Sequence, residues 1–196
     1  MDLDAPLPGQ TPLPDLSGLR QRHVRTTSDL NLAEAENVRR AVIKHLMSST
    51  SPRRARFDVP WMQRLHRDMF GRVWLWAGGL RRHETNIGVA PHRVETELHS
   101  LVADLGAWHG SAMPLHEQAA RLHHRAVAIH PFANGNGRWS RMLANIWLRR
   151  NGARWTEWPE ATIGASSVIR GRYLDALRAA DAGDLGPLTA MHAEFG

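Results

Sequence analysis

The stretch from His130 to Arg141 reads His-Pro-Phe-Ala-Asn-Gly-Asn-Gly-Arg-Trp-Ser-Arg, and it constrains this chain more than any other feature. Pro131 should end a preceding helix, because the residue before a proline is pushed out of the α region. The Asn-Gly-Asn-Gly turn adopts left-handed backbone conformations at low cost and can direct successive N–H groups at an anion. Two arginines then share one face of the following helix. A histidine beside an anion cradle suits a reaction at a phosphate.

Apolar residues spaced at steps of three and four predict helices on both sides of this stretch, over 117–129 and 139–150. The same periodicity predicts helices over 29–47, 58–77 and 94–109, and one or two more within 161–182. Asp29 or Asn31 can cap the first of these helices, and Asp58 the second. Residues 1–28 are predicted to be a Pro-rich N-terminal arm, and residues 29–196 a single domain. The fold class is therefore mainly α, with at most one hairpin.

Composition narrows the classes of function. At 42% hydrophobic residues, this chain of 196 can bury a proper core. It has no cysteine, which excludes disulfides and thiolate metal sites and is compatible with a cytoplasmic location. No apolar run approaches the ~20 residues of a membrane helix, so no membrane partner is expected. The net charge is +6, but the basic residues are scattered, which argues against a nucleic-acid-associated factor.

The motif resembles the signature of the Fic (filamentation induced by cyclic AMP) family, His-x-Phe-x-Asp/Glu-Gly-Asn-Gly-Arg-x-x-Arg. It departs from that signature only at Asn134, where the family has an acid. Leu65-His66 through Gly78 is similar to the segment before the family's flap, and 173–188 resembles its C-terminal helix and turn. The asparagine variant also resembles a subgroup labelled mobile mystery protein B. The resemblance implies a Fic-type helical bundle with one short β-hairpin flap.

The resemblance also implies an activity, the transfer of AMP from ATP to a Ser, Thr or Tyr hydroxyl of a target protein, with Mg²⁺ as cofactor. His130 would be the catalytic base, because a neutral imidazole can accept the hydroxyl proton. In this scheme the loop N–H groups and the Asn136 amide hold the phosphates, and the two arginines bind the β- and γ-phosphates. The implied nucleotide-binding residues are Asn134, Gly135, Asn136, Gly137, Arg138 and Arg141.

The target-docking flap implied by the resemblance is Thr85, Asn86, Ile87, Gly88 and Val89. A hairpin there would align an extended segment of the target by strand addition. An ordinary loop is the alternative reading of the same residues.

Asn134 bears on the metal and on the activity. Mg²⁺ prefers hard oxygen ligands, so a neutral amide oxygen would be a weak ligand and the nucleotide phosphates would supply most of the coordination. Three outcomes stay open: a weakened AMP transferase, transfer of a different phosphate-containing group, or a degenerate Fic domain that binds a nucleotide as a regulator.

Glu36-Asn37 matches the last two positions of the family's inhibitory pattern, Ser/Thr-x-x-x-Glu-Gly/Asn, although Leu32 stands at its first position. The resemblance implies that Glu36, on an inhibitory helix over 30–47, would pair with the second motif arginine and block the γ-phosphate position. The alternative is an exposed helix acid that pairs with Arg40.

Three further histidines, His116, His123 and His124, are predicted to be polar face residues rather than metal ligands, because no nearby acid completes a ligand set. The target protein, an antitoxin or regulatory partner, and a homo-oligomeric state stay open from the sequence.

Overall fold

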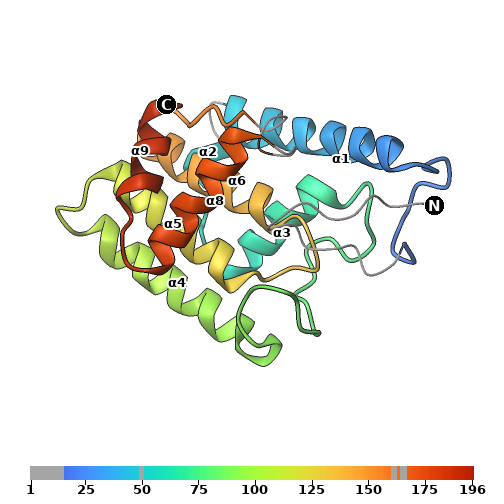
Figure 1. Cartoon of the computed structure of the whole chain (residues 1–196), viewed down its shortest axis with the longest axis horizontal. Coiled ribbons are helices and arrows are strands. Elements are labelled where there is room, and N and C mark those ends of the chain that lie inside the picture. Colours follow the sequence, from blue (N-terminus) through green and yellow to red (C-terminus); the bar gives the residue numbers. More distant parts are fainter. Residues whose placement is uncertain (1–15, 49–50, 160–162, 164–166) are drawn as a thin grey trace.

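The computed structural model describes residues 16–48, 51–159, 163 and 167–196. Within these residues the fold is helical, as predicted, and the β pairing consists of one isolated bridge between Leu19 and Trp74. The helices are α1 (Thr27–Val42, continued by a π-helical turn Ile43–Met47), α2 (Ser51–Arg54), α3 (Val59–Phe70), α4 (Val94–His109, preceded by a 3-10 turn Pro91–Arg93), α5 (Leu115–Ile129), α6 (Asn136–Arg150), α8 (Val168–Asp181) and α9 (Gly186–Glu194), as Figure 1 shows. Most of the predicted N-terminal arm lies outside the described residues.

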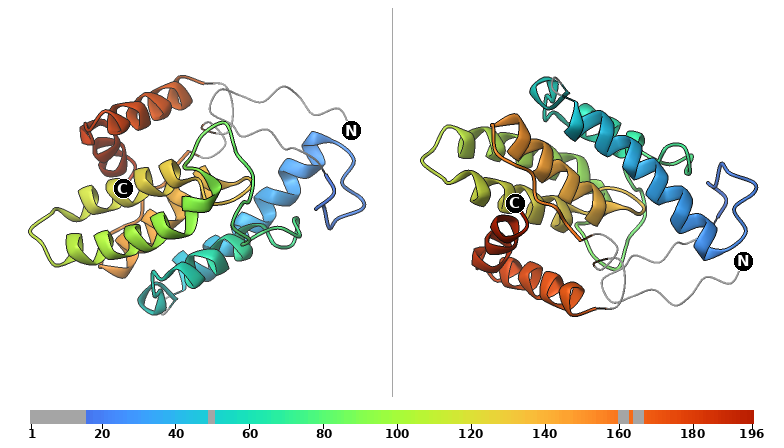
Figure 2. Two further views of the ribbon diagram at one scale, coloured as in Figure 1. Left: turned by 90° about the horizontal axis from the view of Figure 1, so that it is seen from below. Right: turned by 90° about the horizontal axis from the view of Figure 1, so that it is seen from above.

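Helices α5 and α6 pack against each other at the centre of the bundle. On one side α3 contacts α6 and carries α1 on its outer face, whereas on the other side α8 and α9 pack against α5 (Figure 2). Helix α4 lies along α5 and contacts α3. The loop between α5 and α6 carries the motif. It therefore lies between α1 and α3 on one side of the bundle and α8 on the other.

The helix boundaries follow local capping chemistry. Thr26, rather than Asp29 or Asn31, is the N-cap of α1, and Asp29 closes a capping box by accepting a hydrogen bond from the Thr26 N–H at 3.0 Å. Asp58 caps α3 as predicted, since its carboxylate accepts a hydrogen bond from the Trp61 N–H at 2.7 Å.

Helix α3 is shorter than predicted. It ends at Phe70, with Gly71 as C-cap, and turns follow instead of a helix to residue 77. Val73 and Trp74 are fully buried in those turns, so the apolar stripe continues beyond the end of the helix.

The core has two parts. The larger one surrounds α6, whose Leu143, Ile146 and Leu148 are completely buried. The smaller one lies under α8 and α9 and includes Tyr173, Leu188 and Met191. Among the described residues, none of the helices combines the length and apolar character that a bilayer crossing requires.

Candidate functional site

His130 occupies the C-cap of α5 in a left-handed conformation, with φ 53° and ψ 60°. This conformation is unfavourable for a residue other than glycine, so surrounding contacts must hold it. One such contact is the Arg81 guanidinium, whose Nε donates a hydrogen bond to the His130 carbonyl at 2.6 Å. The side chain is only 5% exposed. Burial and the nearby Arg81 charge lower the pKa of His130 to about 4, so the imidazole is neutral at pH 7.

The loop after His130 turns into α6 at Gly135, where φ is +78°. A Cβ at this position would stand 2.7 Å from the Phe70 ring, so only glycine fits. Helix α6 begins at Asn136, earlier than the predicted residue 139. The N–H groups of its first turn, from Asn136 to Arg138, have no acceptors within the helix and form a positive helix end suited to an anion.

The two loop asparagines are engaged with the loop itself. Asn136 is buried, and its amide accepts from the Phe132 N–H at 2.9 Å and donates to the Phe132 carbonyl at 2.8 Å. In this structure the Asn136 amide is engaged with the Phe132 backbone, and its contact with the phosphates stays a prediction. The Asn134 side-chain oxygen accepts a hydrogen bond from the Gly135 N–H at 2.6 Å. Both side chains therefore fix the loop shape in this structure.

His66 of α3 supports the loop from behind. It accepts a hydrogen bond from the Gly78 N–H at its Nδ1 (3.0 Å), so Nε2 carries the proton and donates to the Asn134 carbonyl at 3.0 Å. Its ring stacks on Phe132 with centroids 3.7 Å apart. Burial lowers the pKa of His66 to about 3, which keeps this tautomer neutral. Phe132 is fully buried and anchors the loop in the core, as predicted.

The two motif arginines have different partners. Arg138 forms an ion pair with Glu34 of α1 at 2.7 Å, and its guanidinium lies 4.8 Å from the centroid of the Phe70 ring. Arg141 is 5% exposed, and its Cζ lies 5.3 Å from the centroid of the Tyr173 ring in α8. The α6 end thus presents one arginine to each side of the bundle.

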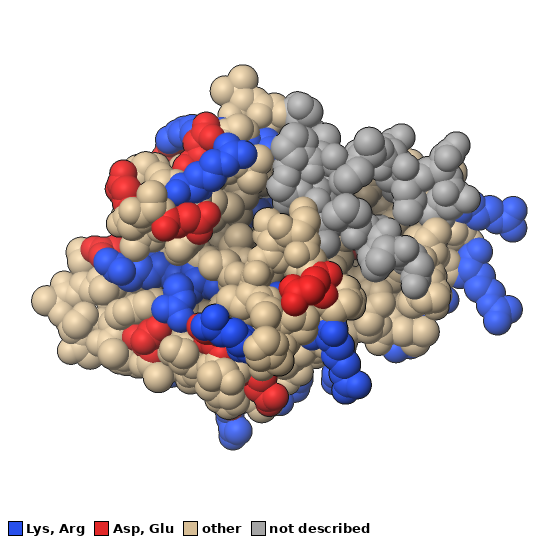
Figure 3. Space-filling model, turned by 60° about the horizontal axis from the view of Figure 1, so that its bottom comes forward, with Lys and Arg blue, Asp and Glu red and all other residues tan. Residues whose placement is uncertain are grey.

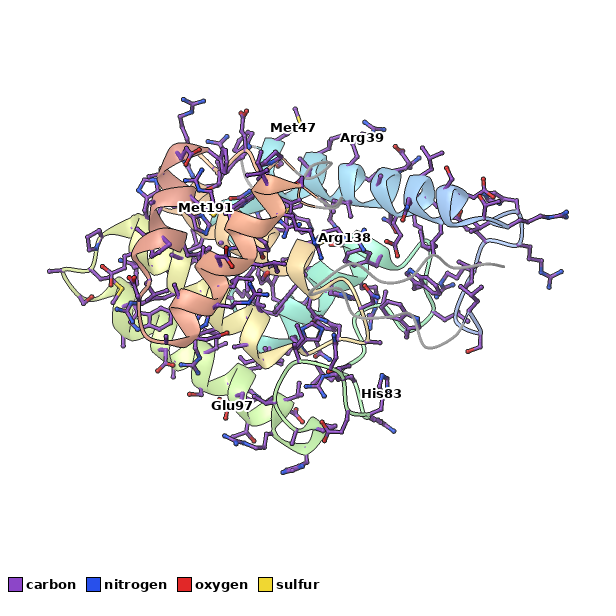
Figure 4. The ribbon with its side chains drawn as sticks, viewed as in Figure 1. Arg39, Met47, His83, Glu97, Arg138 and Met191 are labelled. Carbon is purple, nitrogen blue, oxygen red and sulfur yellow. The ribbon has the colours of Figure 1, made fainter. Side chains whose placement is uncertain are left out.

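Glu34, and not Glu36, faces the motif. Glu34 is buried, and its second carboxylate oxygen accepts a hydrogen bond from Trp74 Nε1 at 2.6 Å. Glu36 is 44% exposed and pairs with Arg39 and Arg40, each at 2.8 Å. In Figure 4, Arg39 points away from the bundle above α1, whereas Arg138 lies on the inner side of that helix.

This placement corrects the expected pairing in two respects: the acid that reaches the motif is Glu34, and the arginine that it meets is the first one, Arg138. The physical reason is the orientation of α1. Asn37 anchors the helix by donating to the Asp68 carbonyl (2.9 Å) and accepting from the Arg72 N–H (2.9 Å). Glu34 shares that inward face, one turn earlier, and Glu36 does not.

The predicted flap forms an irregular loop rather than a hairpin. Residues 82–90 contain no strand. The Val89 N–H donates to the Ile129 carbonyl at 3.4 Å, and Thr85 bonds within the loop to the Ile87 carbonyl at 2.6 Å. Strand pairing needs a partner strand, and these contacts are local or lead to the motif. His83, labelled in Figure 4, marks this loop.

Arg81 ties the flap to His130. Besides the His130 carbonyl, its guanidinium donates to the carbonyls of His83 (3.0 Å) and Val89. A Cβ on Gly88 would stand 2.6 Å from the His130 Cβ, so the flap backbone lies directly against the histidine. Arg81 was not singled out from the sequence, because nothing in its local pattern separates it from its arginine neighbour.

The fit to Mg²⁺ rests on few oxygen atoms. In the described part of the chain, no three His, Cys, Asp or Glu side chains are grouped so that they could hold a metal. The Asn134 oxygen is hydrogen-bonded to the Gly135 N–H, and both oxygens of Glu34 have partners. The described side chains alone therefore do not make a protein-based Mg²⁺ site.

The three other histidines differ from one another. His116 is half-buried, and His124 contacts Asp181 at 2.7 Å. His123, predicted to be a polar face residue, is fully buried and bonds to His192 and Tyr173. On the face drawn in Figure 3, basic side chains lie beside acidic ones. The described residues form ion pairs such as Arg121–Glu117 and Arg125–Asp104.

Comparison with known proteins gives a consistent result. Residues 56–148 match the Fic/DOC family. The chain is 33% identical over 138 residues to Protein adenylyltransferase fic-1 of Caenorhabditis briggsae, a match that covers 66% of this chain and 26% of that protein. The chain thus spans about a quarter of the length of the curated relatives it matches.

Solved structures share the fold. Fic-1 from C. elegans gives a TM-score of 0.69 at 25% identity, covering 89% of this chain and 51% of that chain. The N-terminal Fic domain of a Bartonella quintana cell filamentation protein, with bound ADP, gives 0.70 at 18% identity, covering 93% and 92%. The motif geometry, the matched residues and the shared fold together show that this chain belongs to the Fic/DOC family.

Proposed function

We propose that this protein transfers AMP from ATP to a Ser, Thr or Tyr hydroxyl of a target protein. The observation that carries the proposal is the position of a neutral His130 between the flap backbone at Gly88 and the positive end of α6. A hydroxyl delivered along the flap would meet a proton acceptor, and a phosphate at the helix end would meet N–H donors and two arginines. The curated relatives are adenylyltransferases, which agrees with this chemistry.

The reaction balances with groups that this chain and ATP supply. The target oxygen attacks the α-phosphorus and forms the new P–O bond while its proton moves to the His130 imidazole. The bond from the α-phosphorus to the bridging oxygen breaks, and pyrophosphate leaves. Anionic phosphates beside His130 favour the imidazolium that forms, so nucleotide binding raises the basicity that burial and Arg81 lower in the free protein.

We further propose that Glu34 restrains this activity. Its ion pair with Arg138 occupies a guanidinium that a distal phosphate would otherwise bind, so ATP must displace the carboxylate. The Trp74 bond and the Asn37 anchor hold the acid in place. Glu36, the residue that the sequence pattern favoured, lacks such contacts with the motif.

The test uses ATP labelled at the α-phosphate, incubated with the protein and a cell lysate, with ATP labelled at the γ-phosphate in parallel. We expect label on protein from the α position only. His130→Ala should reduce labelling by about 10²–10⁴-fold, the usual contribution of a general base, while ATP binding measured by calorimetry stays within about twofold.

The alternative is a nucleotide-binding regulator, favoured by the Glu34–Arg138 pair and by Asn134 in place of an acid. Tight ATP binding without transferred label, in wild type and in Glu34→Gln alike, would establish that alternative. Label from the γ position would instead indicate that a different phosphate-containing group is transferred.

A further inference from the structure

Arg141 rests on an aromatic platform from a distant part of the chain. Its Cζ lies 5.3 Å from the centroid of Tyr173, within the range in which a guanidinium is attracted to a ring. Both residues are only 5% exposed, so this attraction acts away from bulk water. Tyr173 is the sole tyrosine of the chain. The ring thereby restricts the positions of a flexible guanidinium at the end of the bundle where the phosphates would bind.

Tyr173 is itself fixed by a line of buried hydrogen bonds. Its hydroxyl lies 3.0 Å from His123 Nε2 of α5, and His123 Nδ1 lies 3.1 Å from His192 Nε2 of α9. His192 Nδ1 lies 2.9 Å from the Thr156 hydroxyl, whose oxygen is also 3.3 Å from the His192 carbonyl. Four side chains from three helices and the segment before α8 are joined in this way.

The donors and acceptors of this line can be assigned. The Thr156 hydroxyl has one proton, and only donation to the His192 carbonyl satisfies both of its contacts, so it accepts from His192 Nδ1–H. His192 Nε2 is then an acceptor for His123 Nδ1–H. His123 Nε2 in turn accepts from the Tyr173 hydroxyl. Each imidazole carries one proton, in keeping with the pKa of His192, which burial lowers to about 3, and of His123, which burial also lowers.

The line continues into the backbone next to α6. Thr156 exchanges two hydrogen bonds with Asn145 of α6, through its carbonyl (2.9 Å) and its N–H (3.1 Å). Asn145 stands one turn after Arg141 on the same helix. The hydrogen bonds that position the Tyr173 ring therefore end on α6, the helix that carries Arg141. A buried network whose donors and acceptors are all paired favours a single geometry.

We propose that Tyr173 is a positioning residue that orients Arg141 toward the distal phosphates of ATP, and that the line through His123, His192 and Thr156 fixes the plane of its ring. This inference rests on the proposed function only insofar as Arg141 binds ATP. Tyr173 acts through the arginine and touches no reacting atom.

The experiment is a double-mutant cycle on nucleotide affinity, measured by calorimetry with a non-hydrolysable ATP analogue and with AMP. Tyr173→Leu should weaken the ATP analogue about tenfold, because a desolvated cation–π contact is worth that much, and AMP less than about twofold. In an Arg141→Ala background, Tyr173→Leu should produce no further loss. Trp155→Leu is the control, since Arg149 lies 5.2 Å from the Trp155 ring in a more exposed cation–π contact away from the motif.

The outcomes separate a positioning role from a general structural one. Equal losses for the ATP analogue and AMP, or the same loss with and without Arg141, would overturn the proposal, as would an Arg141→Ala variant with unchanged affinity. If Tyr173→Leu fails to fold, Tyr173→Phe keeps the ring and removes the hydroxyl. It should then weaken the ATP analogue about threefold, and only when Arg141 is present. Binding is measured without transfer, so the absence of AMP-labelled protein would count against the proposed function and leave this result intact.

Discussion

Glu34→Gln should increase the affinity of this protein for ATP. The substitution keeps the length of the side chain and an oxygen that can accept from Trp74 Nε1, now 2.6 Å from the carboxylate. It removes the negative charge that holds Arg138 at 2.7 Å. In the wild type ATP must break this ion pair before a phosphate can use the guanidinium, whereas in the variant it displaces only a neutral amide.

The magnitude follows from the exposure of the pair. A hydrogen bond between charged groups contributes about 1.5–3 kcal/mol. The Glu34 side chain is 9% exposed, but that of Arg138 is 31% exposed, so water screens part of the interaction and the lower end applies. Since about 1.4 kcal/mol corresponds to a factor of ten, the affinity for ATP should rise about tenfold. AMP, which lacks distal phosphates, should gain much less.

Titration calorimetry on wild type, Glu34→Gln and Glu36→Gln measures this directly. Glu36→Gln is the matched control, because it removes the same charge from the same helix but from a side chain that pairs with Arg39 and Arg40 on the outer face. Unchanged ATP affinity in Glu34→Gln would refute the reasoning. A gain in Glu36→Gln alone would return the inhibitory role to the residue that the sequence pattern favoured.

Three further outcomes are expected. Asn134→Asp preserves the oxygen that accepts from the Gly135 N–H and adds a negative charge. Mg²⁺ titrated into the ADP complex should therefore bind about tenfold more tightly. Equal Mg²⁺ affinity in wild type and variant would exclude a ligand role for residue 134. Arg141→Ala should weaken ATP by about 10–100-fold and AMP far less in calorimetric titrations, because it removes a charged hydrogen bond to distal phosphates. Lowering the pH from 7 to 5 should reduce the free energy of unfolding in urea by about 2 kcal/mol for each of His66 and His192. Their pKa values of about 3 lie below the unfolded value of 6.5, so the unfolded chain takes up protons at a higher pH than the folded one. A free energy of unfolding that stays constant between pH 7 and pH 5 would contradict the burial of both rings in neutral form.

Sequence periodicity located most helices because each buries one stripe against a neighbour. The helix over 94–109 has the predicted limits, and Asp58 caps the predicted start of α3. The same periodicity placed the end of α3 too late. Val73 and Trp74 lie in turns after the helix, but they are buried and follow the helical spacing of the apolar residues before them. Periodicity records burial, and it does not distinguish a helix from turns packed on the same core.

The choice between Glu34 and Glu36 shows a different limit. A pattern match assigned the role to Glu36 by its position in a short motif. The buried stripe of α1 is Leu30, Glu34, Asn37 and Ala41, and because two of its four members are polar, apolar periodicity does not indicate it. An acid on the inward face of a helix needs a cation, and that requirement indicates Glu34 without any reference to a family.

Contacts distant in sequence could not be predicted in this way. His123 was expected on a polar face, yet it bonds to His192, 69 positions away. No local property of either residue indicates that α9 would return to α5. Arg81 and His66 support the motif across separations of 49 and 68 positions for the same reason.

The residues that support the motif and the acid proposed to restrain it lie on different elements. The loop is held from behind by His66 of α3, and His130 is held by Arg81. Glu34 of α1 meets the motif at the guanidinium of Arg138, whereas the hydrogen bonds of His66 and Arg81 to the loop involve neither Glu34 nor Arg138. If Glu34 restrains the activity as proposed, ATP can displace it without breaking the hydrogen bonds that hold His130 and the loop. Displacing Glu34 requires breaking one ion pair with Arg138. The charged hydrogen bonds that a triphosphate forms can exceed the free energy of that pair.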